Sequence, residues 1–143
     1  MLYLLADIVL LDVPTFTMPH SILLIDDDPA TRDLFRLVAE FNGIKLFAVE
    51  DGESAFNYLE QHTPDIIIVD LYLFGMDGFE IAQQIRHSDL NPHCPIVATT
   101  AYYTSSAVRD VILNGFDAFL PKPISVMNLM PFLRQVVLQE LDP

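Results

Sequence analysis

Six side chains able to take part in metal or phosphoryl chemistry stand where apolar runs of the sequence end: Asp26, Asp27, Asp28, Asp70, Thr100 and Lys122. Clustered carboxylates repel one another, and a hard divalent cation such as Mg²⁺ relieves that repulsion. A carboxylate can itself attack phosphorus and form an aspartyl phosphate. A lysine ammonium and a hydroxyl can neutralise and hydrogen-bond the phosphoryl group. If these side chains meet, the sequence predicts a site for phosphoryl transfer.

Each of these residues also has a structural interpretation. An Asp triplet in front of a helix commonly caps that helix, and Asp28 before Pro29 fits the role of an N-cap. A single Asp at a strand end is more often a turn residue, and a lysine between prolines can be a solvated loop cation. The functional interpretation is favoured because four such features coincide at the ends of four apolar runs.

Those runs alternate with amphipathic stretches from Ile22 onward. Apolar, β-branched runs predict strands at 22–25, 45–49, 66–69, 96–99 and 118–120. Helical periodicity predicts helices from Pro29, over 53–61, 79–87 and 105–114, and from near Asn128. We place the last start near Asn128 because proline is tolerated only in the first helical turn, and Pro131 follows.

The first helix has an apolar stripe that we expect to face the core, made of Leu34, Leu37, Val38 and Phe41. Five strand–helix units in a row predict an α/β fold with a parallel sheet covered by helices on both faces. In such sheets ligands bind beyond the carboxyl ends of the strands, where the six side chains are expected to gather.

The composition limits the kinds of partner and the cellular compartment that we expect for this protein. The formal charge of −13 opposes binding to nucleic acid or anionic membranes and favours cations or a basic protein. Cys94 is the sole cysteine, which fits a reducing compartment, so we expect a cytoplasmic protein. The four histidines lack metal-ligand spacing and are expected at the surface. Residues 1–17 are apolar but lack the basic start and small-residue cleavage site of a signal peptide. We treat them as an N-terminal arm of uncertain role in front of one domain, 18–143.

Four segments resemble, in order, the receiver domain of response regulators in two-component signalling: ILLIDDDPATRDLF, PDIIIVDLYLFGMDGFE, PIVATTAY and GFDAFLPKPI. The resemblance extends from Ser21 to about Leu138, and the chain is similar to stand-alone, chemotaxis-type regulators. It implies a flavodoxin-like, doubly wound five-stranded parallel sheet with strand order 2-1-3-4-5. It also implies a signalling module, not an enzyme.

The resemblance assigns a role to each candidate residue. Asp70 would be the phosphoacceptor, and Asp27, Asp70 and the Tyr72 carbonyl would ligate Mg²⁺, with Asp26 acting through water. Thr100 would hydrogen-bond the phosphoryl group and Lys122 would pair with it. Thr100 and the aromatic Phe119 would form the conformational switch, and the bond after Lys122 would be cis.

Partners follow from the same resemblance. The phosphoryl group would come from a histidine kinase or histidine phosphotransfer protein. The signal would leave through the fourth helix, fifth strand and last helix to a protein partner. The sequence departs from the family at Phe74, where similar proteins usually carry proline, and at Tyr72 and Tyr102, where smaller or polar residues are common.

Three alternatives compete with this assignment. A receiver-like module could bind proteins without phosphorylation, although every expected acidic, hydroxyl and lysine position is present. An aspartyl-phosphate phosphatase would need a second acid two residues after the nucleophile, where Tyr72 stands. A flavin-binding module is disfavoured because carboxylates follow the first strand in place of a phosphate-binding loop.

Overall fold

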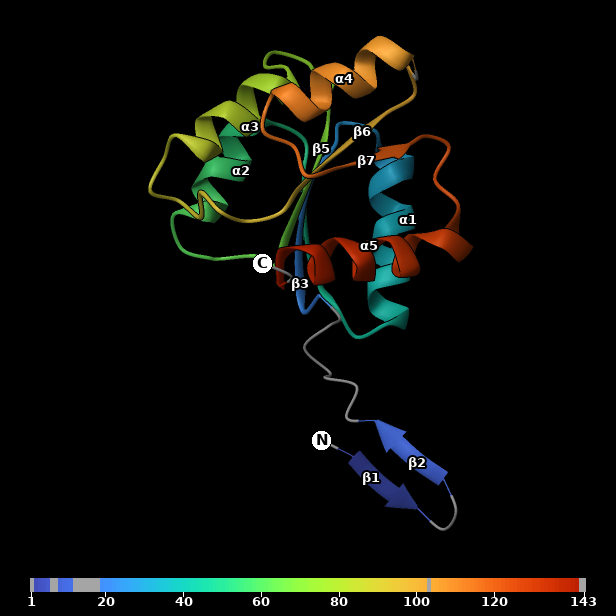
Figure 1. Ribbon diagram of the computed structural model, residues 1–143. Coiled ribbons are helices and arrows are strands. Elements are labelled where there is room, and N and C mark those ends of the chain that lie inside the picture. Colours follow the sequence, from blue (N-terminus) through green and yellow to red (C-terminus); the bar gives the residue numbers. More distant parts are fainter. Residues whose placement is uncertain (1, 6–7, 12–18, 103, 142–143) are drawn as a thin grey trace.

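The computed structural model describes residues 2–5, 8–11, 19–102 and 104–141. From residue 21, five strands alternate with five helices (Figure 1). In chain order these are β3 (Ser21–Ile25), α1 (Pro29–Phe41), β4 (Lys45–Val49), α2 (Gly52–Leu59), β5 (Ile66–Asp70), α3 (Gly78–Arg86), β6 (Ile96–Thr100), α4 (Ser105–Leu113), β7 (Ala118–Pro121) and α5 (Val126–Leu141).

The five strands form one parallel sheet in the order β4-β3-β5-β6-β7. Counted along this sheet, the order is 2-1-3-4-5, which confirms the predicted doubly wound fold. The register pairs Ile25 with Val69, Asp70 with Thr99, and Thr100 with Pro121. The ends of β3, β5, β6 and β7 therefore meet at a single edge of the sheet, which is the edge expected to carry the site.

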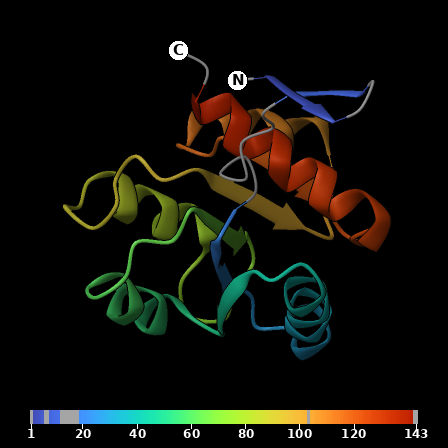
Figure 2. The same ribbon diagram turned by 90° about the horizontal axis from the view of Figure 1, so that it is seen from below.

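Helices cover both faces of this sheet (Figure 2), and a hydrophobic core lies on each face. Side chains of α2, α3 and α4 pack on one face, and side chains of α1 and α5 pack on the other. All five residues of β5 are buried because this central strand is covered on both faces. The helices therefore hold the strand that carries Asp70 in a rigid position.

The prediction that the apolar stripe of α1 faces the core is wrong in part. Val38 is buried, but Leu37 is 65% exposed and Phe41 is 90% exposed. The helix instead turns Thr31, Phe35, Val38 and Ala39 toward the sheet. This second stripe has the same helical periodicity, and the small Ala39 allows close packing, so one apolar edge of α1 is left outside the core.

The last helix also differs from its expected start. It begins at Val126, two residues before Asn128, so Pro131 lies inside it beyond the first turn. Pro131 has no amide hydrogen and cannot complete the helical bond to residue 127. Burial of Leu129, Leu133 and Val136 against the sheet compensates for that missing bond.

Ahead of this sheet, β1 (Leu2–Leu5) and β2 (Ile8–Leu11) pair in antiparallel fashion as a separate two-stranded sheet. The rest of the expected arm, and its boundary at Met18, lie outside the described residues. Among the helices that the structure describes, none is both long enough and apolar enough to cross a membrane.

Candidate functional site

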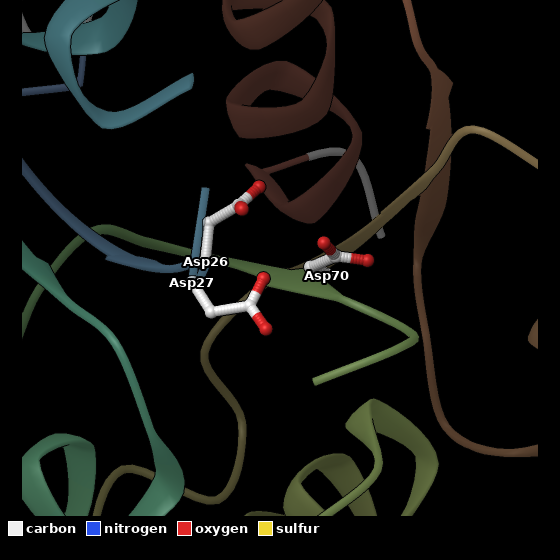
Figure 3. Close-up of side chains that lie close together, drawn as sticks. All are labelled: Asp26, Asp27 and Asp70. Carbon is white, nitrogen blue, oxygen red and sulfur yellow. The ribbon is translucent and has the colours of Figure 1, made fainter. Parts of the chain in front are cut away.

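Three carboxylates meet where β3 and β5 end. Asp26, Asp27 and Asp70 each offer an oxygen, and these oxygens lie within 4.8 Å of one another (Figure 3). Asp26 is completely buried, Asp70 is 7% exposed and Asp27 is half-buried. The structure therefore brings together the predicted acidic residues, at the predicted edge of the sheet.

Lys122 completes the cluster from the end of β7. Its Nζ lies 2.9 Å from Oδ2 of Asp26 and 3.1 Å from Oδ2 of Asp70. Its backbone amide donates to the carbonyl of Thr100 at 2.9 Å, which fixes the start of the loop to the end of β6. The Lys122–Pro123 peptide bond is cis, as the resemblance implied.

Burial and charge oppose each other in this cluster. Burial raises the pKa of Asp26 above its usual value, and the hydrogen bond and charge of Lys122 only partly offset that effect. Burial also disfavours the ammonium of Lys122, but Asp26 and Asp70 outweigh it and raise the pKa of this lysine. One ammonium contacts two of three neighbouring carboxylates, so the cluster keeps an excess of negative charge that suits a divalent cation.

The consecutive aspartates have different roles. Asp28 is the N-cap of α1: its carboxylate accepts from the amide of Ala30 and the hydroxyl of Thr31. These hydrogen bonds lower the pKa of Asp28, that from Thr31 most. The capping prediction for Asp28 is confirmed. The Asp28 amide in turn donates to Oδ1 of Asp26 at 2.9 Å, which orients that carboxylate.

Thr100 and two tyrosines border the cluster. Thr100 is completely buried, and its hydroxyl oxygen accepts from the amide of Tyr102 at 3.0 Å. Oδ1 of Asp70 accepts from the amide of Tyr72 at 3.1 Å. Both tyrosine rings are more than half exposed and meet edge to face. Phe119, the expected switch residue, is partly buried against the core on the α2–α4 face.

Three further residues support the site; Arg32 was not singled out from the sequence, and Phe74 was noted only as a departure from the family. The guanidinium of Arg32 donates to the carbonyl of Asp26 at 2.9 Å and pairs with Glu50. A side chain at Gly78 would collide with the carbonyl of Asp70, so glycine is required there. The Phe74 amide reaches Oδ2 of Asp27 at 3.4 Å, a contact that proline could not make.

The remaining candidates lie elsewhere. All four histidines are exposed, as expected: His20, His62, His87 and His93. Within the described part of the chain, the three aspartates are the one group of metal-ligating side chains that comes together.

The comparisons with known proteins agree with this geometry. The response regulator receiver domain family matches residues 22–134. The polar-differentiation response regulator DivK of Brucella anthropi is 29% identical over 117 residues, covering 82% of this chain and 95% of DivK.

Solved structures give the same result. A putative response regulator from Chloroflexus aurantiacus superposes with a TM-score of 0.78 at 28% identity, covering 84% of this chain and 98% of its own. The receiver domain of a Pseudomonas aeruginosa sensor histidine kinase, solved with a magnesium ion in its active site cleft, has a TM-score of 0.75 at 25% identity. That comparison covers 82% of this chain and 97% of the neighbour. The fold, the acidic pocket and the family match together place this chain among the response regulator receiver domains of two-component signalling.

Proposed function

We propose that Asp70 accepts a phosphoryl group from a phosphohistidine of a histidine kinase or histidine phosphotransfer protein. A carboxylate oxygen of Asp70 attacks phosphorus, and the phosphorus–nitrogen bond to the donor imidazole breaks with its electron pair staying on nitrogen. That nitrogen takes up a proton from water, so the donor leaves as neutral imidazole. The observation that carries this proposal is the placement of Asp70 at the end of β5, beside two more carboxylates and 3.1 Å from Lys122.

The acidic cluster is suited to hold Mg²⁺ during this transfer. Asp27, Asp70 and the carbonyl of Tyr72 would be direct ligands, and Asp26 would act through water. The bound ion would supply positive charge to the transferred phosphoryl oxygens. The donor set of clustered carboxylates is the kind that Mg²⁺ prefers. A magnesium ion occupies the cleft of the similar Pseudomonas receiver domain.

Lys122 and Thr100 act after transfer in this proposal. Lys122 exchanges its contact with the Asp70 carboxylate for an ion pair with the phosphoryl group. Thr100 donates its hydroxyl hydrogen to a phosphoryl oxygen, because its own oxygen already accepts from the Tyr102 amide. The chain's part in the reaction is therefore to position the nucleophile and to neutralise charge.

The output surface follows from the switch residues. Movement of Thr100 toward the phosphoryl group would shift the β6–α4 connection, and Phe119 on β7 would follow it. We assign the signalling face to α4, β7 and α5. The occupant of that face is a downstream protein, so the domain acts as a signalling module whose product is a conformational state.

Small phosphodonors test this function without the natural kinase. With acetyl phosphate or phosphoramidate and Mg²⁺, intact-mass spectrometry should find one added phosphate on the wild type and none on Asp70→Asn. Asp70→Asn keeps the size of the side chain, so loss of labelling cannot be assigned to a cavity. Equal labelling of both proteins would overturn the assignment, and labelling of neither would favour a module that acts by protein binding alone.

The metal is tested separately by thermal unfolding. Mg²⁺ binds the folded state, so the midpoint of the wild type should rise as its concentration increases. Asp27→Ala should abolish this rise, whereas Asp33→Ala, an exposed aspartate outside the cluster, should keep it. A rise that persists in Asp27→Ala would place the metal elsewhere.

A further inference from the structure

The outer edge of α1 forms an apolar groove with the start of α5. Leu37 and Phe41 stand outside the core, at 65% and 90% exposure, and Val126 is 50% exposed. The groove between the two helices has a volume of about 440 Å³ and is lined by Leu37, Val38, Phe41, Asn42, Val126 and Met130. Five of these six side chains are apolar, so this surface favours an apolar occupant over water.

The N-terminal hairpin is a second apolar surface in the same chain. Its strands read LYLL and IVLL, with no charged residue in either, so both of its faces are apolar by sequence. An isolated two-stranded hairpin is marginally stable in water at best. An apolar surface that covers one of those faces would therefore stabilise the pairing of β1 with β2.

The chain enters the main fold beside this groove. The carbonyl of His20 accepts from the amide of Lys45 at 2.9 Å, and only residues 42–44 separate Lys45 from the end of α1 at Phe41. Residues 12–18 join β2 to this point, and seven residues can span up to about 25 Å. That reach is comparable with the length of α1, about 20 Å for its 13 residues.

We propose that the hairpin of residues 2–11 docks on the groove between α1 and α5 of its own chain. A tethered segment meets its site at an effective concentration in the millimolar range, so modest apolar burial is enough to keep it bound. An anionic membrane is an alternative surface for the hairpin. The negative charge of the chain, including Asp7 and Asp12 in the arm, opposes binding to such a membrane. Docking would give the arm a fixed place without making it part of the sheet.

Hydrogen exchange of the full-length protein tests this docking. Peptides covering residues 2–11 should exchange at least tenfold more slowly in the wild type than in Phe41→Glu or Leu37→Glu. Both substituted side chains are exposed, so the fold should persist. Leu113→Glu is the matched control, because Leu113 is 73% exposed on α4, away from the groove, and should leave the protection intact.

Three results would overturn the proposal. The first is exchange of residues 2–11 at the unprotected rate in the wild type, and the second is protection that survives Phe41→Glu unchanged. Protection that falls on dilution, together with a dimer mass in light scattering, would identify a second copy as the occupant. Docking within one chain would be established by three observations together: the protein is a monomer, the protection does not depend on concentration, and the protection is lost in Phe41→Glu but kept in Leu113→Glu.

Discussion

The rings of Tyr72 and Tyr102 meet edge to face, with centroids 5.3 Å apart and an interplanar angle of 87°. Their backbone amides donate to Asp70 and to Thr100, so the pair is fixed to both residues at the edge of the site. Hydrolysis of an aspartyl phosphate needs water opposite the bond that breaks. We predict that this ring pair excludes water and slows phosphate loss, and that Tyr72→Asn and Tyr102→Ala each accelerate it several-fold to tenfold. A tenfold change corresponds to about 1.4 kcal/mol of barrier.

The contact between the rings gives this prediction a second part. Removing either ring releases the other, so the double variant should lose phosphate little faster than the faster single variant. Tyr72→Phe and Tyr102→Phe keep the rings and should behave like the wild type. Phosphate loss is measured by intact mass over time in saturating Mg²⁺. Unchanged rates in both single variants and in the double variant would remove the shielding argument.

Lys122 neutralises the completely buried Asp26, and its removal should destabilise the fold. Removing one partner of a buried ion pair leaves an uncompensated charge. We therefore expect the free energy of unfolding of Lys122→Met to be lower than that of the wild type by on the order of 2–3 kcal/mol at pH 7. The pKa of Asp26 is already raised by burial and would rise further without the ammonium. A raised carboxyl pKa favours folding at low pH and costs stability as pH rises through the folded pKa.

The difference in the free energy of unfolding between the wild type and Lys122→Met should therefore shrink as the solution is acidified from pH 7 toward pH 4.5. Urea unfolding of both proteins across this pH range measures this difference. Lys45→Met is the control, because Lys45 is exposed and forms no ion pair that the structure records among the described residues. A deficit of the same size at every pH would mean that Asp26 is not the group left uncompensated.

Asp51 caps α2 and should make part of the stability pH-dependent. Its carboxylate accepts from the Ser54 amide at 2.8 Å, and hydrogen bonds from Ser54 lower its pKa below the usual 3.8. A carboxyl pKa that is lower in the folded than in the unfolded state stabilises the fold at pH values above the unfolded-state pKa. This stabilisation is lost as the pH falls through the folded-state pKa. Asp51→Ala should cost about 1 kcal/mol at pH 7, whereas Asp51→Asn keeps the cap.

Below about pH 4 the wild type should lose stability relative to Asp51→Asn, since the Asn variant keeps a cap that does not titrate. Thermal unfolding of both proteins between pH 2.5 and pH 6 measures this difference in stability. A difference that stays constant through this range would show that the cap is insensitive to the charge of Asp51.

The arm is expected to be dispensable for the fold. A protein that starts at Met18 retains β3 and every later element, and it should unfold cooperatively and accept phosphate on Asp70. Circular dichroism and intact mass after treatment with acetyl phosphate measure both properties. Failure of this shortened protein to fold would show that residues 1–17 contribute to the core.

Much of the site could be predicted because parallel strands end at one edge. Once the apolar runs before Asp27, Asp70 and Lys122 were identified as strands of one parallel sheet, their side chains had to converge. The loop contacts could not be predicted, since the Phe74 amide and the close approach of Gly78 depend on the path of the chain between β5 and α3.

The orientation of α1 shows a different limit of the sequence. The stripe with Leu37 and Phe41 and the stripe with Phe35 and Ala39 have the same helical spacing, and periodicity alone cannot choose between them. Packing against the sheet decides, because Phe35 and Ala39 join the buried cluster on that face and the small Ala39 permits close approach. The prediction failed where two apolar stripes share one helix.

The central claim is that the phosphoryl group is carried by Asp70. Borohydride reduces an acyl phosphate to the alcohol, so an aspartyl phosphate becomes homoserine and marks its own position. The wild type is treated with acetyl phosphate and Mg²⁺, reduced, digested and sequenced by tandem mass spectrometry, with Asp70→Asn as the control. The account predicts homoserine at position 70 and at no other aspartate, and none in Asp70→Asn. Homoserine at Asp26 or Asp27 in place of Asp70 would contradict it.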